Sequence, residues 1–193
     1  MATVYKQHIG LLSPIIDYIR IEKVNALVAS GRRVLDVGCG PSFMAPRLGK
    51  RCNYTGVDWN PDIVAENRRR FPDLRFECFD ATQAWPFEGN SFDTVLIVGV
   101  LEHVTKRLEM LSEAARVMVN GGQFIATTPS RVGGVVHDVF SSIRLFSHHA
   151  AEDHKDFFNG AAMRQLAEQC HLIPERIEYF ELGMNQLFVL RKP

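Results

Sequence analysis

The chain has 193 residues, of which 46% are hydrophobic and 23% charged, values typical of one globular domain with its own core. Its 22 basic residues equal its 22 acidic residues, so no bulk electrostatic attraction to nucleic acid or to an anionic membrane is expected. We find no leader pattern, no apolar run long enough for a membrane span and no CxxC pair among the four cysteines. These features predict a reduced, cytoplasmic protein.

An amphipathic helix is expected near the N-terminus, where apolar residues recur at helical spacing between residues 8 and 29. Its apolar face is marked by Ile9, Leu12, Ile16 and Ile19. From residue 32 onward, short apolar runs alternate with helical segments. This alternation predicts a doubly wound α/β sheet.

Five strands are expected in this alternating region. The fourth, FDTVLIVGV, is apolar at nearly every position, as in a parallel strand that is buried on both faces. Asn60 followed by Pro61 predicts the start of a helix after the second strand. The other strands are RRVLDVGC, YTGVDW, LRFECFD and GGQFIATTP. The helix before the fifth strand is marked by Leu108, Leu111, Ala115 and Met118.

The last third of the chain has a different pattern. Residues 130–158 are irregular or loosely helical and are interpreted either as a lid over the substrate or as packing against the sheet. A helix at NGAAMRQLAEQC precedes an antiparallel hairpin formed by EYFELG and NQLFVLRK. We therefore expect one domain with four parts: a helical cap (1–30), a cofactor-binding core (32–129), a substrate lid (130–158) and a closing helix with hairpin (159–193).

The first strand is followed by the glycine-bearing turn GCGPSF. Gly38 permits a sharp turn, and Gly40 lets the backbone approach a ligand closely. A dinucleotide fingerprint needs a third glycine where this chain has Phe43, which disfavours NAD and FAD. No Gly-Lys-Ser/Thr follows, so a P-loop is excluded. The alternative is a tight turn that binds nothing.

Three carboxylates accompany this turn. Asp58 ends the second strand about twenty residues after the glycines, where a carboxylate can accept hydrogen bonds from both ribose hydroxyl groups. Asp36 precedes the first glycine and favours a ligand with nearby positive charge over a diphosphate. Asp80 follows the third strand, and its alternative role is to cap the turn there. Together they point to a cationic ligand that contains adenosine.

At this point residues 32–129 resemble the class I S-adenosylmethionine-dependent methyltransferases, in order and in spacing. VLDVGCG, GVDWN, FECFDA and FDTVLIVGVLEHV resemble the first four motifs of that family, and ARVMVNGGQFIATTP resembles its fifth strand. The resemblance implies a mostly parallel seven-stranded sheet with an antiparallel C-terminal hairpin strand, and S-adenosyl-L-methionine as the cofactor. The family commonly has a further glycine where this chain has Ser42, so the fine shape of the turn stays open.

The resemblance also implies a cofactor contact for each matching position. Trp59 has the alternative interpretation of a half-buried core residue. The implied contacts are Asp36 at the ammonium group, Gly38, Cys39 and Gly40 along the methionine part, Asp58 at the ribose, Trp59, Asp80 and Ala81 around the adenine, and Val98 and Gly99 at the methionine end.

Two histidines are candidate catalytic residues. A sulfonium methyl is already activated, so its transfer requires in-line orientation and needs a base only when the acceptor must lose a proton. His103 follows the fourth strand, and its alternative role is to order the next helix start. His154, in EDHKDFF, resembles a histidine near the active-site rim of small-molecule members of the family. The spacing in HHAAEDH fits no zinc motif, so no metal is expected.

A small-molecule acceptor is favoured over nucleic acid. After the fourth strand the chain reads GVLEH, not the Asn/Asp-Pro-Pro-aromatic turn that the resemblance associates with methylation of base amines. No Pro-Cys pair supplies a nucleophile for carbon-5 methylation of cytosine. Two alternatives remain, namely a non-catalytic cofactor-binding module that senses a ligand or supports a partner, and a nicotinamide oxidoreductase, which Phe43 disfavours. The acceptor atom and the oligomeric state stay open.

Overall fold

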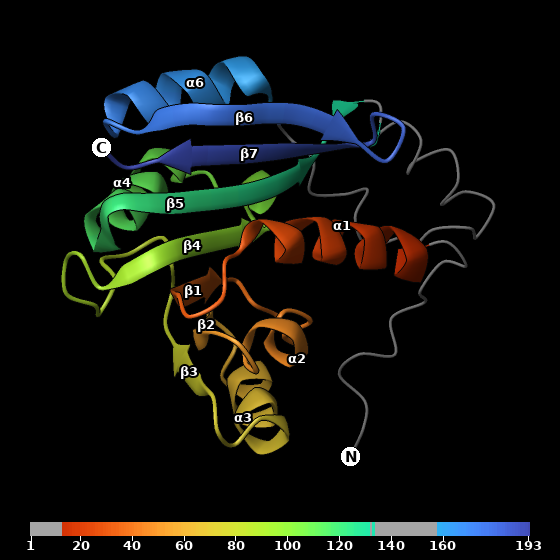
Figure 1. Ribbon diagram of the computed structural model, residues 1–193, viewed down its shortest axis with the longest axis vertical. Coiled ribbons are helices and arrows are strands. Elements are labelled where there is room, and N and C mark those ends of the chain that lie inside the picture. The colour runs from red at the N-terminus through yellow and green to blue at the C-terminus, as the bar shows by residue number, and fades with distance from the viewer. Residues whose placement is uncertain (1–12, 132, 134–157) are drawn as a thin grey trace.

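The computed structural model describes residues 13–131, 133 and 158–193, and it is built around one seven-stranded sheet (Figure 1). The strands are β1 (Arg33–Val37), β2 (Asn53–Asp58), β3 (Arg75–Cys78), β4 (Phe92–Val98), β5 (Met118–Pro129), β6 (Ile173–Phe180) and β7 (Asn185–Arg191). The helices are α1 (Ser13–Leu27), α2 (Ala45–Leu48), α3 (Pro61–Arg70), the short 3₁₀ helix η1 (Leu101–His103), α4 (Arg107–Val117) and α6 (Gly160–Gln169).

The strand order is β3-β2-β1-β4-β5-β7-β6, and the first five strands run parallel. β7 is antiparallel to both of its neighbours, β5 and β6. The predicted doubly wound sheet with an antiparallel C-terminal hairpin is therefore confirmed. Chain order reverses between β1 and β4, and ligands of open α/β sheets bind at such a switch point, beyond the carboxyl ends of the strands.

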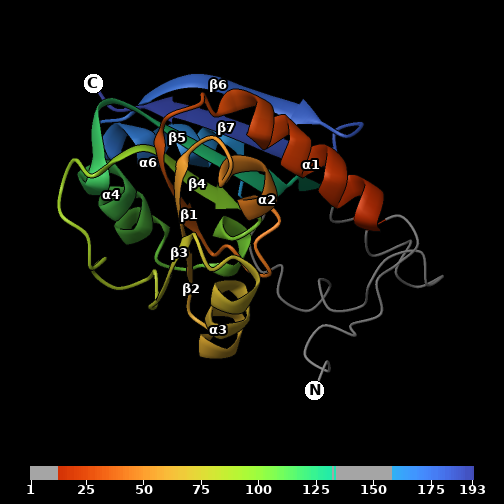
Figure 2. The ribbon, with the colours of Figure 1, turned by 60° about the horizontal axis from the view of Figure 1, so that its bottom comes forward.

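Helices cover both faces of the sheet (Figure 2). Because successive side chains of a strand point to opposite faces, β1 contributes Leu35 to one core and Val34 to the other. The core that contains Leu35 also holds apolar side chains of α4 and α6, whereas the core that contains Val34 holds side chains of α1, α2 and α3. The carboxyl edge of the sheet is thus held between two packed layers.

The start of α3 is the one expected from the sequence. The Asn60 side chain accepts hydrogen bonds from the backbone N–H groups of Asp62 and Ile63, and Pro61 occupies the first turn. An asparagine in this position supplies an acceptor for helix N–H groups that have no partner within the helix. This cap fixes the chain immediately after the end of β2.

The apolar faces of two helices differ from those predicted. Ile19 is 45% exposed, and α1 instead directs Ile21 and Val24 into the core. In α4, Leu111 is buried as expected, whereas Leu108 is 39% exposed and the buried Met118 already belongs to β5. A periodic pattern fixes which residues share a face but leaves the direction of that face to tertiary packing.

Among the described residues, no helix is both long and apolar enough to cross a bilayer.

Candidate active site

The glycine turn connects β1 to α2 and uses two glycines with positive φ. Gly38 has φ +71°, and an added Cβ would overlap the Val100 side chain after β4. Gly40 has φ +53°, and an added Cβ would have no neighbour within 4 Å among the described atoms. The first glycine therefore permits close packing of two turns, and the second borders open space where a ligand can approach the backbone.

The Asp58 carboxylate, at the end of β2, joins the glycine turn to α3. It is buried, and its Oδ2 accepts a 2.9 Å hydrogen bond from the Gly40 N–H. Its Oδ1 accepts a 3.0 Å bond from the Asn60 N–H. An ionised carboxylate has about four acceptor positions, so these two bonds orient the group and leave acceptor capacity for ligand hydroxyls.

Beneath the turn, three side chains form a buried chain of hydrogen bonds. The Tyr54 hydroxyl donates a 2.6 Å bond to Asp36 Oδ2. The Ser42 hydroxyl lies 2.8 Å from the Tyr54 oxygen, and it donates there because the Tyr54 proton is already committed to Asp36. Burial raises the pKa of Asp36 to about 6; the Tyr54 bond opposes that rise and the nearby Asp58 carboxylate adds to it.

Ser42 also explains how the turn forms without the further glycine. Its φ is +55°, in the left-handed region that glycine adopts readily, and its side chain is fully buried. The hydrogen bond to Tyr54 gives the buried hydroxyl a partner. Serine therefore occupies a glycine conformation here and uses its side chain as an anchor.

The Cys39 thiol points into the packing below the turn. Asn67 Nδ2 donates a 2.7 Å bond to the Gly40 carbonyl and lies 3.8 Å from Cys39 Sγ. Cys39 is buried, and an added Cβ at Gly56 would lie 3.1 Å from its sulfur. Only the backbone of Cys39, and not its thiol, is therefore placed to contact a ligand at the turn.

The residues proposed around an adenine follow β2 and β3. Trp59 is 73% exposed, which excludes the core interpretation. Asp80 is exposed, and its Oδ1 accepts bonds from the Thr82 N–H (2.9 Å) and hydroxyl (2.8 Å), which lower the pKa of Asp80. Asp80 thus caps the turn after β3, the alternative role expected for it, and its position beside this turn is compatible with an additional ligand contact.

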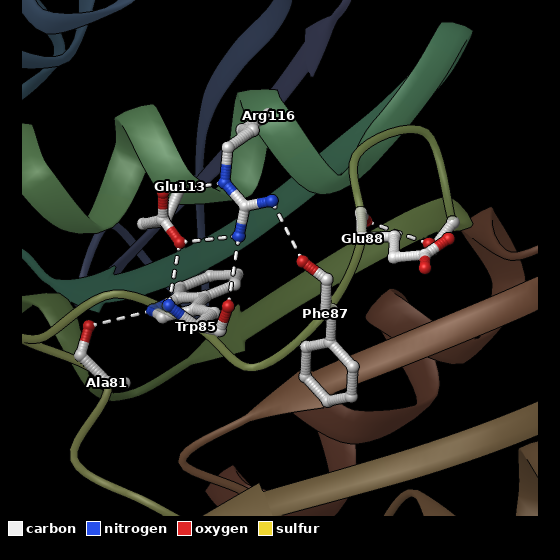
Figure 3. A network of polar contacts seen from close by, with 7 residues as sticks. Ala81, Trp85, Phe87, Glu88, Glu113 and Arg116 are labelled. Atoms are coloured by element: carbon white, nitrogen blue, oxygen red, sulfur yellow. Dashed lines mark hydrogen bonds and ion pairs between the residues drawn. The ribbon is translucent and has the colours of Figure 1, made fainter.

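The loop that carries Ala81 is fastened to α4 (Figure 3). The Trp85 indole N–H donates a 2.9 Å bond to the Ala81 carbonyl, and its backbone N–H donates a 2.7 Å bond to Glu113. Arg116 donates to the carbonyls of Trp85 (3.0 Å) and Phe87 (2.8 Å), and it pairs with Glu113. Sequence reasoning missed this network because its members are about 30 positions apart and follow no motif.

On the other side of the switch point, β4 ends at the partly buried Val98, followed by Gly99. Gly99 has φ +69°, and its N–H donates a 3.0 Å bond to the Thr127 carbonyl of β5. An added Cβ at Gly99 would lie 3.6 Å from Arg20 Nη1 and 3.8 Å from Glu102 Oε1. Helix α1 therefore brings a guanidinium to the end of β4, a placement that sequence reasoning missed because the helix lies outside the motif region.

Arg20 and Glu102 are both incompletely paired in this position. Arg20 bonds Asp17 through Nη2, while its Nε is buried and has no partner among the described residues. Glu102 Oε2 is likewise buried without a partner in the described part of the chain. Burial raises the pKa of Glu102 to about 7, and the charges of Arg20 and Arg107 oppose that rise.

The two candidate catalytic histidines differ in what the structure says of them. His103 ends η1 with its side chain exposed, and its backbone N–H donates a 3.0 Å bond to the Val100 carbonyl. His154 lies outside the described residues, as do His137, His148 and His149. Within the described ranges, no group of three or more His, Cys, Asp or Glu residues is placed to hold a metal ion.

Comparisons with known proteins agree with this geometry. Residues 35–126 match a family described as a methyltransferase domain. The chain is 41% identical over 104 residues to a fatty-acid O-methyltransferase of Mycolicibacterium smegmatis, covering 50% of this chain and 37% of that protein. It is 36% identical over 116 residues to the EEF1A lysine methyltransferase 4 of Mus musculus, covering 50% of this chain and 45% of that protein. The chain thus spans less than half the length of these relatives.

Solved structures show the same fold. A TehB-like S-adenosylmethionine-dependent methyltransferase of Corynebacterium glutamicum superposes with a TM-score of 0.69 at 17% identity, covering 90% of this chain and 87% of that one. At this identity the likeness establishes the fold, while the family match and the curated relatives carry the assignment. Residues 35–126 are therefore a methyltransferase domain, and they lie within a fold that the chain shares with S-adenosylmethionine-dependent methyltransferases.

Proposed function

We propose that this chain transfers the methyl group of S-adenosylmethionine to a small-molecule acceptor. The observation that carries the proposal is the oriented Asp58 carboxylate, bonded to the Gly40 N–H beside open space at the switch point. Such a carboxylate can accept hydrogen bonds from the two hydroxyl groups of a ribose. The glycine backbone next to it lets the rest of an adenosine ligand approach closely.

The surrounding charges fit a cation that also carries a carboxylate. The Asp58 carboxylate lies close enough to Asp36 that its charge contributes to the raised pKa of Asp36. Two carboxylates below the turn disfavour a diphosphate and favour an ammonium or a sulfonium. At the end of β4, the Arg20 guanidinium beside Gly99 is suited to pair with the carboxylate of the methionine part.

When bound, S-adenosylmethionine supplies an electrophilic methyl group on a sulfonium. The chain then has to hold that group in line with the acceptor and to keep the reactants in fixed orientation, which can lower a barrier by roughly 7–11 kcal/mol. Two packed layers fix the carboxyl edge, and the Asp58 and Trp85 bonds fix the turns around it. These residues bind and orient, and none of them needs to donate or accept a proton.

A base is required only for an acceptor that must lose a proton. We assign this role to His103, because it follows β4 at the same edge as Gly99 and its side chain is exposed. His154 stays the second proposed base on the sequence resemblance alone. A neutral imidazole near neutral pH is suited to accept that proton.

One assay can distinguish a small-molecule acceptor from a protein acceptor. A fatty acid and a protein lysine appear in the names of the two relatives, and the balanced net charge gives this chain no bulk attraction for nucleic acid. We would measure release of S-adenosylhomocysteine with pools of metabolites and with pools of lysine-containing peptides. Release with metabolites supports the proposal. Release with peptides only would overturn the small-molecule assignment, and binding of the cofactor without release from any pool would favour the non-catalytic alternative.

A further inference from the structure

The space beside Gly99, just after β4, is bounded by two opposite charges. An added Cβ at Gly99 would lie 3.6 Å from Arg20 Nη1 and 3.8 Å from Glu102 Oε1, and no described atom outside the adjacent residues lies nearer to that point. These are ordinary contact distances, so the space can hold an atom of a ligand. Val100, the next residue, packs against Gly38, which places this space beside the glycine turn.

The Glu102 carboxyl borders this space without a cation bonded to it. Burial raises the pKa of Glu102 to about 7, although the charges of Arg20 and Arg107 oppose the rise. Arg20 is bonded to Asp17 instead, and Arg107 directs its Nε to a backbone carbonyl at 2.8 Å. Within the described ranges Glu102 therefore forms no ion pair, so a cation brought by a ligand would give its carboxylate a partner.

Asp36, which the family resemblance implies at the ammonium group of the cofactor, lies less favourably for direct contact. It is 3% exposed beneath the turn, and its Oδ2 already accepts a bond from the Tyr54 hydroxyl. The charge of Asp36 can still favour a cation above the turn. Glu102, in contrast, borders the space beside Gly99 with its Oε1 atom.

The methionine part of the cofactor carries its ammonium and its carboxylate on one carbon atom. A site that recognises both groups must therefore hold a negative and a positive side chain close together. Arg20 Nη1 and Glu102 Oε1 meet this condition, because both lie within 4 Å of the same point at Gly99. Hydrogen bonds between charged partners are stronger than those between neutral ones, so each side chain can select one group.

We propose that Glu102 binds the ammonium group of the cofactor's methionine part, opposite Arg20, the proposed partner of its carboxylate. The inference rests on the proposed function, because it assigns Glu102 to the cofactor of the same reaction. The two side chains then recognise different groups of one ligand, and replacing either one should affect different analogues of that ligand.

Analogues of S-adenosylhomocysteine that lack a charged group test this assignment. The decarboxylated analogue keeps the ammonium, the deaminated analogue keeps the carboxylate, and methylthioadenosine lacks both. We would measure their dissociation constants by calorimetry of the full chain at about pH 7.5, above the pKa of Glu102. Glu102→Gln removes the charge and keeps the size of the side chain. We expect this variant to bind S-adenosylhomocysteine and the decarboxylated analogue at least about tenfold more weakly, and the other two ligands unchanged.

Two further glutamine variants are measured beside it. Arg20→Gln should show the opposite pattern, with weaker binding of S-adenosylhomocysteine and the deaminated analogue and unchanged binding of the decarboxylated one. Glu109→Gln changes an exposed glutamate in the first turn of α4 and should leave all four affinities unchanged.

Filling the space is a second test that keeps both charges. Gly99→Ala places a methyl group between Arg20 and Glu102, and it should weaken S-adenosylhomocysteine at least about tenfold more than methylthioadenosine. Alanine is strained at the Gly99 φ of +69°, so Gly121→Ala, at φ +74° with no neighbour within 4 Å of the added Cβ, is the matched control and should change neither affinity. The glutamine variants decide the test if Gly99→Ala fails to fold.

Unchanged affinities in Glu102→Gln, or an equal loss for the decarboxylated and deaminated analogues, would overturn the assignment. So would a decarboxylated analogue that binds the wild-type protein no more tightly than methylthioadenosine does. These results would leave the proposed function intact as long as S-adenosylhomocysteine binds. Failure of S-adenosylhomocysteine to bind the wild-type protein would count against the proposed function itself.

Discussion

The Tyr54 hydroxyl donates a 2.6 Å hydrogen bond to the buried carboxylate of Asp36, and thereby links β2 to β1 directly beneath the glycine turn. Tyr54 also accepts a hydrogen bond from the Ser42 hydroxyl, so the Tyr54 phenol joins the buried side chains of Asp36 and Ser42. The floor of the proposed cofactor site is thus polar, buried and hydrogen-bonded. Its disruption should affect stability, pH dependence and ligand binding in different ways.

Replacing Tyr54 by phenylalanine should destabilise the protein without a large change in packing. The change leaves the Asp36 carboxyl buried without its donor, which costs about 1–3 kcal/mol of unfolding free energy. It should also raise the pKa of Asp36 above its present value of about 6, because the bond from Tyr54 now lowers it. Urea denaturation measures the first effect. Tyr179→Phe, at an exposed position, is the control, and equal stability of the two variants would contradict the prediction.

The stability of the ligand-free protein should fall as pH rises from about 4 to about 6. The folded-state pKa of Asp36, about 6, is above the ordinary value of 3.8, so the folded protein holds a proton that the unfolded chain releases. The contribution is complete below the unfolded pKa and is lost as pH rises through the folded one, at most about 3 kcal/mol. Glu102 extends the decline through about pH 7.

Thermal unfolding followed across this pH range would measure the effect. In Asp36→Asn the decline between pH 4 and 6 should become smaller, while the part that belongs to Glu102, between its ordinary pKa of 4.5 and its folded value of about 7, remains. A stability that rises in the wild-type protein over the same interval would show that the raised pKa of Asp36 does not govern this range.

Ser42 should respond differently to glycine and to alanine. Ser42→Ala keeps the positive φ of +55° and removes the hydrogen bond to Tyr54, so we expect a loss of about 1–2 kcal/mol. Ser42→Gly also loses that bond, but glycine adopts the left-handed region without steric cost. The glycine variant should therefore be the more stable of the two by urea denaturation. A more stable alanine variant would mean that backbone conformation does not limit this position.

Arg20 should recognise the carboxylate of the cofactor. Arg20→Gln is expected to weaken binding of S-adenosylhomocysteine at least about tenfold, or roughly 1.4 kcal/mol, because the guanidinium lies beside Gly99. Methylthioadenosine lacks the carboxylate and should bind both proteins equally. Lys23→Gln, on the same helix but paired with Glu178, is the matched control for calorimetry. An equal loss for both ligands would mean that Arg20 acts on the fold and not on the carboxylate.

The alternation of strands and helices along the chain and the position of the glycine turn were predictable from sequence because they follow local patterns. The glycines at 38 and 40 and the cap at Asn60 are determined by backbone conformation, which a few neighbouring residues specify. The buried faces of α1 and α4 could not be predicted from sequence, since packing against the sheet decides which side of a helix is covered.

The candidate site likewise contains residues that could be found from the sequence and residues that could not. Asp36, Asp58 and Gly99 could be found because each ends a strand or lies in a motif. Arg20 could not be found from the sequence, since α1 reaches this edge only through tertiary contacts. Ser42 was noted as a departure from the family pattern, but its anchoring role required the position of Tyr54.

The central claim is that the switch point binds S-adenosylmethionine through Asp58, and calorimetry of the wild-type protein with three ligands tests it most directly. We expect S-adenosylmethionine and S-adenosylhomocysteine to bind and NAD not to bind. Asp58→Asn should weaken both interactions at least about tenfold, whereas Asp62→Asn, at an exposed carboxylate in the first turn of α3, should leave them unchanged. Binding of NAD without binding of S-adenosylmethionine, or unchanged affinity in Asp58→Asn, would contradict the claim.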